Sequence, residues 1–437
     1  MQIAVFNLGI CNFMLVVLML VNIVPPSSSA DVVCPDTCWC NTLEEKIVAV
    51  CMEHNLTSVP HYFDKKTQEI ILMFNTIDIL PDYVFHGLQN ISILILQHNK
   101  LRELREQSLD GLYNLVYLDL SHNNIVIMPS RIIQNNEKIK FFYLNHNDIT
   151  ITGPFLVSPS LTLLDVSFCK ISFLPHDSFI GIPNLTKLKI NDNFITEIEM
   201  YAFRGLKRLE LLTLRNNDVT TLDFSLFQGL EELRFVDFTN NSISTIPYDI
   251  FEKNRKLRFL FLKNNSLSLP QTGPIFASDS LSHLDISFCN IHFMPIGAFK
   301  RLQNLTTLRM TGNPLNSLNT QILQPLQKLQ VVLLGPESSC SEQSFRDVFE
   351  YFEENSVVYY APPLCNETIL MDTNVVYTIP PTTEESSGGY TSTKSTHIWY
   401  TSTAVQSNSS VRPICSFYTN YRLINVIIIL CTFMIYR

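Results

Sequence analysis

Three histidines recur at a fixed spacing and are the first candidates for chemistry in this chain of 437 residues. His98, His122 and His146 are 24 residues apart, and each stands directly before an Asn. Imidazoles stacked about 5 Å apart can hold a metal ion or respond to acid pH, because their pKa lies near neutrality. The His-Asn phrase also belongs to a longer repeating pattern, which favours a structural origin for the alignment.

Cysteines offer a second kind of chemistry. The four nearest the N-terminus are spaced C-x3-C-x-C-x10-C and are Cys34, Cys38, Cys40 and Cys51. In an exported chain this spacing predicts two disulfides, whereas export disfavours a zinc site built from the same ligands. Cys340 and Cys365 are predicted to bridge near the other end. Each bridge would stabilise the fold by about 3 kcal/mol.

No catalytic constellation accompanies these residues. The sequence has no Gly-rich phosphate loop, no His-Glu-x-x-His and no Gly-x-Ser-x-Gly, which are the motifs that would indicate phosphoryl transfer or hydrolysis. The formal net charge of -9 leaves no basic surface for nucleic acid. We therefore predict a protein that is not an enzyme, has no cofactor or metal, and binds no nucleic acid.

The elements that must position any functional residue come from a 24-residue repeat. The phrase L-x-L-x-x-N-x-L recurs, with Ile, Val, Phe or Met allowed for Leu. Its Asn falls at Asn75, Asn99, Asn123, Asn147, Asn193, Asn217, Asn241, Asn265 and Asn313, and two further Asn positions hold Cys169 and Cys289. Every step is 24 residues except the 22 between Asn147 and Cys169. This period predicts a solenoid whose coils share one core.

Within each repeat the pattern predicts one short strand and one turn. Leu118 and Leu120 alternate with polar neighbours, as in a strand with one buried face. Asn123 follows at the strand end, where its amide can bond backbone groups of the turn and of the next coil. Cys169 and Cys289 are predicted to be buried free thiols. Five coils of about 4.8 Å separate them by roughly 24 Å, too far for a disulfide.

A second hydrophobic column repeats on the other side of the predicted sheet. Its members are Phe85, Leu109, Ile133, Phe155, Phe179, Phe203, Phe227, Phe251 and Phe299. Their stacked side chains predict a hydrophobic ridge behind the sheet. Residues 152–154 recur as 272–274, and 164–169 recur with two changes as 284–289. This indicates duplication of a five-repeat block.

The two ends of the chain predict export and anchoring. An apolar run from Phe13 to Val24 with a small-residue exit predicts a signal peptide over residues 1–30, although no Lys or Arg precedes the run. Residues 367–410 are rich in Ser and Thr, as in an O-glycosylated stalk. Residues 411–437 resemble a GPI-anchor signal, with attachment at Asn408, Ser409 or Ser410. A short membrane segment and plain secretion are the alternatives.

Between these ends the chain is predicted to form three parts. They are an N-terminal cysteine cap over 31–68, about 12 repeats over 69–336, and a C-terminal cap over 337–366. In the last part Phe345, Val348, Phe349 and Phe352 fall on one face of a predicted helix, which would cover the last coil.

Sequons for N-glycosylation are spread along the chain. They are predicted to be used at Asn55, Asn90, Asn184, Asn240, Asn264, Asn304 and Asn366, while an eighth overlaps the predicted anchor site at Asn408. So many sequons in an exported chain indicate a glycoprotein.

The candidate binding surface is the concave sheet, whose outward strand positions are free for a partner. Two aromatic groups stand at these positions: Tyr117, Phe141 and Tyr143, then Phe235, Phe259 and Phe261. Clustered exposed aromatics mark partner sites. The alternative is that the first aromatic of each strand is half buried by the preceding turn and serves packing.

Residues 34 to about 365 resemble the extracellular leucine-rich repeat superfamily in its typical 24-residue class. The resemblance rests on the cysteine cap, the Asn ladder and the Phe column, and departs from the usual form where the C-terminal cap has only Cys340 and Cys365. It implies an α/β-type leucine-rich repeat solenoid, or horseshoe. A parallel β-sheet would line its concave face, with an irregular or short-helical convex side and disulfide caps.

A repeat ectodomain on a stalk with a lipid anchor resembles chaoptin-like and connectin-like adhesion proteins. That resemblance implies cell adhesion or recognition at the extracellular face of the plasma membrane. The partner would be a cell-surface or extracellular protein, including a second copy of this chain. The alternative is an innate-immune or ligand-binding co-receptor that recognises a secreted or microbial ligand, similar to the ectodomains of Toll-like receptors.

Overall fold

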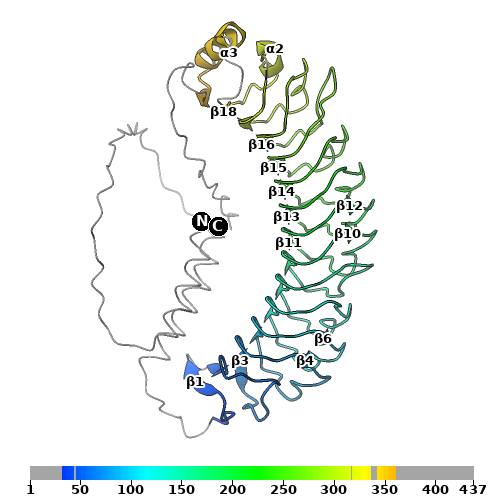
Figure 1. The fold of residues 1–437 in the computed structure, drawn as a ribbon, viewed down its shortest axis with the longest axis vertical. Helices are drawn as coiled ribbons and strands as arrows, with labels where there is room; N and C mark the ends of the chain where they lie inside the picture. The colour runs from blue at the N-terminus through cyan, green and yellow to red at the C-terminus, as the bar shows by residue number, and fades with distance from the viewer. Residues whose placement is uncertain (1–31, 44–45, 316, 336–341, 361–437) are drawn as a thin grey trace, which may run out of the picture. The chain divides into compact units, whose positions relative to one another are not determined.

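One long sheet of short strands organises the molecule (Figure 1). The computed structural model describes residues 32–43, 46–315, 317–335 and 342–360, which belong to one compact unit. The 15-stranded sheet begins with β1 (Trp39–Leu43) paired antiparallel to β2 (Lys46–Val50). All later pairs in the sheet are parallel.

The later strands of this sheet follow the repeat. They are β3 (Thr67–Ile71), β5 (Ile93–Ile95), β7 (Tyr117–Asp119), β8 (Phe141–Tyr143), β9 (Leu163–Asp165), β11 (Lys187–Lys189), β13 (Leu211–Thr213), β14 (Phe235–Asp237), β15 (Phe259–Phe261), β16 (His283–Asp285), β17 (Thr307–Arg309), β18 (Val331–Leu333) and β19 (Val358–Tyr360). The predicted solenoid of parallel strands is confirmed.

The convex side of the described residues is mostly turns. It holds two small parallel sheets, β4 (Ile79–Leu80) with β6 (Glu103–Leu104) and β10 (Phe173–Leu174) with β12 (Glu197–Ile198). Near the end of the array come helices α2 (Thr320–Leu323) and α3 (Glu342–Glu354). The irregular convex side expected from the sequence is therefore also confirmed.

The sheet exists because each repeat places a buried aliphatic or aromatic residue at the centre of its strand. Leu118, Phe142 and Leu164 are fully buried and lie opposite one another in adjacent strands. The strands stay in register along the repeats because each coil presents the same core residue at the same height. The outward residues of successive strands are consequently aligned in columns across the concave face.

The predicted Asn ladder is present and satisfies the turns. At Asn217, Nδ2 donates to the carbonyls of Ile190, Leu214 and Arg215 at 3.0, 3.1 and 3.2 Å. Its Oδ1 accepts from the backbone N–H of Ile195 at 3.1 Å. One buried amide therefore joins its own turn to the preceding coil.

The two cysteines in the ladder are buried and free, as predicted. Cys169 Sγ donates to the carbonyl of Leu144 at 3.5 Å, and Cys289 Sγ to that of Leu262 at 3.1 Å. Burial raises the pKa of each thiol to about 12. Both thiols thus stay protonated at neutral pH, which suits a structural donor rather than a nucleophile.

The predicted Phe column packs behind the sheet. Phe179 and Phe203 stack at 5.9 Å between ring centroids, and Phe227 and Phe251 at 4.9 Å. Between Phe251 and Phe299, the fully buried Phe276 continues the column; its ring lies edge-on to Phe251 at 5.7 Å. This ridge holds the convex turns against the core.

Both ends of the array are closed. Disulfides Cys34–Cys40 and Cys38–Cys51 form the N-terminal cap, so all four predicted half-cystines are paired. At the other end α3 buries Phe345, Val348 and Phe352, while Phe349 is partly buried against the same core, as the helical lid required.

Several predicted features lie outside the described residues. They are the Cys340 and Cys365 bridge, the signal peptide, the stalk and the anchor signal. Within the described residues, no helix combines the length and apolar character needed to cross a membrane.

Candidate binding surface

The concave face carries two aromatic clusters. In the first aromatic cluster, Tyr117 lies 5.3 Å from Tyr143 and 6.4 Å from Phe141 between ring centroids. All three side chains are half-buried. Strands β7 and β8 supply them, and in-register pairing places Tyr117 opposite Phe141. The structure therefore brings these three predicted site residues together.

The second aromatic cluster repeats the geometry of the first. Phe235 lies 5.2 Å from Phe261 and 6.1 Å from Phe259 between ring centroids, and all three side chains are half-buried. Strands β14 and β15 supply them. Half-burial, expected as the alternative for the first aromatic of each strand, thus extends to the last aromatic as well. The rings support one another and still present part of their surface.

Carboxylates stand at the third strand position, buried by more than the sequence indicated. Placed there as outward residues by the repeat, Asp119, Asp165, Asp237 and Asp285 are each at most 9% exposed. Each carboxylate Oδ1 accepts a hydrogen bond from the backbone N–H two residues later. Neighbouring side chains cover these aspartates because the turn that follows draws each carboxylate down toward the backbone.

Three of these four carboxylates are paired with a cation from an adjacent strand or its turn. Lys189 Nζ lies 3.4 Å from Asp165, Arg215 Nε 3.6 Å from Asp237, and Arg309 Nη1 3.7 Å from Asp285. Asp119 is the exception: no Lys, Arg or His of the described residues pairs with it.

An apolar patch at the N-terminal end of the concave face was missed by sequence reasoning. Ile70 and Leu72 enter the main core, so the alternating residues Ile71 and Met73 face the other side, where they form a separate cluster with Ile95. Val48 and Val50 complete this cluster, and five partly buried residues border it: Trp39, Met52, Phe74, Ile93 and Tyr117. The available signal was an unbroken apolar run, 70–74, in place of alternation.

Glu69 lies at this end of the same face. Its side chain is 4% exposed, with Lys46 Nζ 4.0 Å away, and its Oε2 has no hydrogen-bond partner among the described residues. Burial raises the pKa of this carboxyl, an effect that Lys46 partly opposes.

The three aligned histidines form part of a stack of five rings along the edge where the strands end. The order is Phe74, His98, His122, His146 and Phe168, with successive centroids 4.6, 4.1, 4.0 and 4.3 Å apart. Every member has a positive φ between 54° and 58°. That left-handed turn before each ladder Asn holds the rings face to face.

This histidine stack is poorly arranged for a metal ion. Ring nitrogens lie in the ring plane, so nearly parallel imidazoles direct their lone pairs side by side rather than toward one point. Among the described residues there is also no group of three or more His, Cys, Asp or Glu that could hold a metal ion. The repeat-based interpretation of the histidines fits this geometry.

Acid pH should nevertheless act on the histidine stack. Burial, and then the proximity of His146, lower the pKa of His98. Because the unfolded chain then binds a proton more readily than the folded one, stability is lost as pH falls through the ordinary histidine value near 6.5. We expect His98→Asn to reduce the drop in Tm between pH 7.5 and pH 5.

Asn is a suitable replacement because Asn216, Asn240 and Asn264 hold the equivalent position with φ between 54° and 57°. His54→Asn, at an exposed position in the N-terminal cap, is the matched control. An equal change in the pH dependence of Tm for both variants would contradict the assignment to His98.

Further along the same edge the stack gives way to a ladder of polar side chains. Asn216 donates to Asp192 at 2.7 Å, Asn240 to Asn216 at 2.6 Å, and Asn264 to Asn240 at 3.0 Å. The sequons Asn240 and Asn264 are exposed here. Glycans on them, which remain a prediction, would project from this half of the edge and not from the histidine stack.

The other sequons lie elsewhere. Asn55 and Asn90 are exposed, whereas Asn184 and Asn304 are half-buried. The Asn184 and Asn304 amides donate to the carbonyls of Pro159 and Asp279 at the turn before the strand. Asn366 and Asn408 lie outside the described residues.

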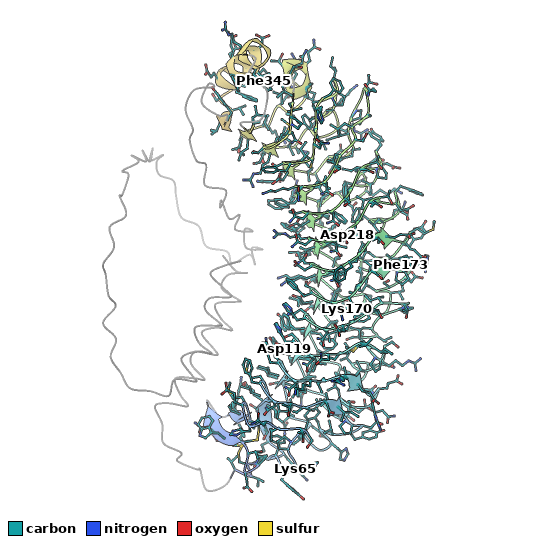
Figure 2. The ribbon with its side chains drawn as sticks, viewed as in Figure 1. Lys65, Asp119, Lys170, Phe173, Asp218 and Phe345 are labelled. Atoms are coloured by element: carbon teal, nitrogen blue, oxygen red, sulfur yellow. A yellow bond between two sulfur atoms is a disulfide. The ribbon has the colours of Figure 1, made fainter. Side chains whose placement is uncertain are left out.

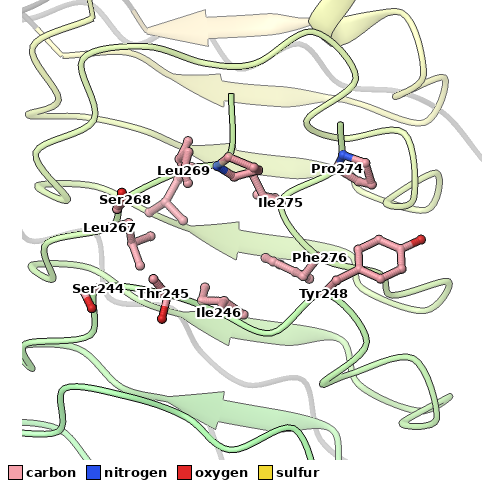
Figure 3. A pocket seen from close by; sticks show the side chains of 12 residues that line it. Ser244, Thr245, Ile246, Tyr248, Leu267, Ser268, Leu269, Pro274, Ile275 and Phe276 are labelled. Carbon is pink, nitrogen blue, oxygen red and sulfur yellow. The ribbon is translucent and has the colours of Figure 1, made fainter. Parts of the chain in front are cut away.

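A pocket of about 410 Å³ opens beside the coils that follow β14 and β15 (Figure 3). Its walls include Ile246, Leu267, Leu269 and Phe276, with Tyr248 as its one titratable residue. The coil from Asn265 is two residues longer than its duplicate from Asn147, so the loop has more chain than the coil needs. The mainly aliphatic lining offers no catalytic chemistry.

The distribution of side chains in Figure 2, with Asp119 on the inner side of the array and Phe173 on the outer side, matches the predicted division into concave and convex faces. A model of leucine-rich repeats matches residues 65–125, 91–149, 159–219, 208–267 and 279–335, together more than half of the chain. The chain belongs to the leucine-rich repeat family. Membership implies a protein-binding role for this leucine-rich repeat protein, and its cap disulfides are typical of a secreted or extracellular protein.

Solved structures share the fold. One is the octameric complex of latrophilin 3, Unc5D and the leucine-rich repeat of FLRT2, with 23% identity, a TM-score of 0.57, and coverage of 75% of this chain and 92% of the matched chain. Another is the leucine-rich repeat domain of APL1B, with 20% identity, a TM-score of 0.53, and coverage of 74% and 90%.

A third similar structure is a complex of TLR13 with the RNA ssRNA13. Its identity is 25% and its TM-score 0.46, over 62% of this chain and 47% of the matched chain, so the leucine-rich repeat protein spans about half that chain's length. No curated protein matches the sequence.

Proposed function

We propose that this leucine-rich repeat protein is a cell-surface binding protein that mediates cell adhesion or recognition through its concave face. The observation that carries the proposal is the pair of aromatic clusters with matching geometry on β7–β8 and β14–β15. Aromatic side chains with part of their surface exposed on a rigid scaffold are typical anchors of protein interfaces. No catalytic role and no cofactor is assigned to this surface.

The spacing of the clusters fits one protein partner lying along the array. At about 4.8 Å per strand, the five steps from β7 to β14 place them roughly 24 Å apart. A partner surface of ordinary interface size can reach both. The FLRT2 complex, in which a leucine-rich repeat assembles with other proteins, supports a protein as the partner.

The proposed signal peptide over 1–30, the stalk over 367–410 and the GPI-anchor signal over 411–437 would present this face outside the plasma membrane. Release of the displayed protein by a phosphatidylinositol-specific phospholipase would support the lipid anchor. Retention on the cell after that treatment would favour a membrane segment.

Cell mixing tests the adhesion proposal. Non-adhesive cells that display the full chain are mixed with bare cells, and clusters of the displaying cells alone would establish homophilic adhesion. Mixed clusters would indicate a common surface ligand. Absence of clusters with display verified would contradict adhesion and favour the co-receptor alternative, in which the ligand is secreted or microbial.

The aromatic clusters give the matching mutations. We expect Tyr143→Ser combined with Phe261→Ser to reduce clustering at least tenfold, because an interface anchor contributes about 2 kcal/mol or more. Surface display and Tm serve as the folding check. Phe194→Ser is the control, since its ring is 59% exposed and lies outside both clusters. Unchanged clustering in the double variant would remove the aromatic clusters from the binding surface.

A further inference from the structure

The two aromatic clusters differ in one respect that bears on their ligand. Tyr117, Phe141 and Tyr143 correspond to Phe235, Phe259 and Phe261 at an offset of 118 residues. The same offset relates Asp119 to Asp237. Each cluster thus has three rings around one buried carboxylate, and the ring distances agree within 0.3 Å.

The second aromatic cluster already contains a cation. Arg215 follows β13, and its Nε lies 3.6 Å from Asp237 Oδ2 with the Arg side chain 52% exposed. The residue at the same offset in the first cluster is Gln97, which follows β5. On the other side of Asp119, the paired strand presents the neutral Tyr143. Both neighbouring positions that supply cations elsewhere on the sheet are therefore neutral at Asp119.

We propose that Asp119 and the rings of Tyr117, Phe141 and Tyr143 form a receptor for an arginine side chain of the protein partner. The inference rests on the proposed binding function of the concave face and specifies its chemistry. The partner's guanidinium would supply in trans the charge that Arg215 supplies in cis to Asp237. Arginine suits the site because its planar cation both stacks on aromatic rings and pairs with a carboxylate.

The carboxylate of Asp119 is reachable although its neighbours cover most of it. Asp165, Asp237 and Asp285 are buried to a similar degree, yet each accepts a cation. Those cationic side chains remain 21–52% exposed, so they lie over the face. A side chain that approaches from the concave side can follow the same route to Asp119.

The internal bonds of Asp119 leave its charge uncompensated. Ser121 donates to Oδ1 from its backbone N–H at 2.9 Å and from its hydroxyl at 2.6 Å, and the Tyr117 side chain also hydrogen-bonds to the carboxylate. These are neutral donors, which orient the carboxylate without neutralising it. A partner's cation would find an oriented anion in an apolar surround, where an ion pair is stronger than in water.

The pH dependence of the pairing follows from the same site. Burial raises the pKa of Asp119 to about 6, and the nearby Asp165 adds to the shift. The other titratable groups facing the carboxylate are the Tyr117 and Tyr143 phenols, which stay neutral below pH 8, while β5 presents the uncharged Gln97. Because the arginine pairs with the ionised form, its binding should weaken as pH falls through 6.

Two reciprocal substitutions test the assignment in the full chain. Gln97→Arg places a cation where Arg215 stands in the second cluster and should close the first site. Arg215→Gln removes that cation and should open a second site. Asp119→Asn keeps an oxygen acceptor for Ser121 and removes the charge. Tm of each variant, measured beside wild type, verifies that the solenoid is folded.

The probe is the tripeptide acetyl-Gly-Arg-Gly-amide, with the neutral isostere citrulline in place of Arg as its control. Binding to the full chain at pH 7.5 is measured by saturation-transfer difference NMR on the arginine methylenes. We expect a signal with wild type, at least a fivefold loss with Gln97→Arg and with Asp119→Asn, and about a twofold gain with Arg215→Gln. Equal signals for the citrulline peptide, or for wild type and Gln97→Arg, would overturn the proposal, as would no signal with wild type.

Cell mixing with the Gln97→Arg variant separates this inference from the proposed function. If wild-type cells cluster and Gln97→Arg cells cluster equally, adhesion stands and the arginine receptor fails. If the peptide binds as expected but no cells cluster, the receptor stands and adhesion fails. Loss of clustering in Gln97→Arg together with loss of peptide binding supports both.

Discussion

Phe227→Ala is expected to lower the free energy of unfolding by about 3–5 kcal/mol, the usual cost of removing a buried aromatic ring from a packed core. Phe227 is fully buried in the Phe column. Its ring stacks on Phe251 at 4.9 Å and meets Phe238 edge-on at 6.3 Å. The substitution therefore removes contacts to the next coil and to the strand core together. Because each coil of a solenoid is stabilised by its neighbours, the effect should extend beyond one coil.

Urea denaturation followed by circular dichroism measures this loss. Phe224→Ala is the matched control, since the same residue type lies three positions earlier with its side chain 53% exposed, and we expect a change below about 0.5 kcal/mol. A similar midpoint shift in the two variants would show that the column does not stabilise the array.

The repeat phrase was sufficient to predict which side chains form the core. Leu118, Asn123 and Phe179 occupy the predicted places because their roles depend on position within one coil, and every coil repeats those positions. Cys169 illustrates the same point: its size and weak donor suit the ladder, so the slot alone predicted a buried free thiol.

The character of the concave face was predicted less completely, because it depends on pairs of residues far apart in the sequence. Asp119 and Asp237 look alike within their own repeats. They differ because the preceding coil presents Gln97 beside the first and Arg215 beside the second. The burial of these carboxylates was also missed, since it arises from the turn that follows each strand and from side chains of adjacent strands.

The edge of the sheet shows what spacing alone can and cannot provide. Equal spacing predicted that His98, His122 and His146 align. It did not predict that Phe74 and Phe168 complete the stack, because ring orientation follows from the left-handed backbone at each position. The parallel orientation of the rings, rather than their separation, is what argues against a metal ion here.

Asn217→Ala is expected to destabilise the array by about 3–5 kcal/mol, since several buried backbone groups lose partners and each unsatisfied group costs about 1–3 kcal/mol. Three carbonyl groups lose their donor, and the N–H of Ile195 loses its acceptor. Because that N–H belongs to the preceding coil, the substitution also weakens the contact between coils. Asp218→Ala, at the adjacent exposed position, should change the unfolding midpoint little.

The chain itself provides an intermediate variant. In Asn217→Cys, a thiol can make the single weak bond that Cys289 makes to Leu262, and burial keeps such a thiol protonated, as the raised pKa of Cys289 shows. We therefore expect stability, measured by urea denaturation, to decrease from wild type to Asn217→Cys to Asn217→Ala. Equal stability of the Cys and Ala variants would mean that size alone lets cysteine occupy the ladder. The stated order would mean that the ladder depends on the bonds each side chain makes.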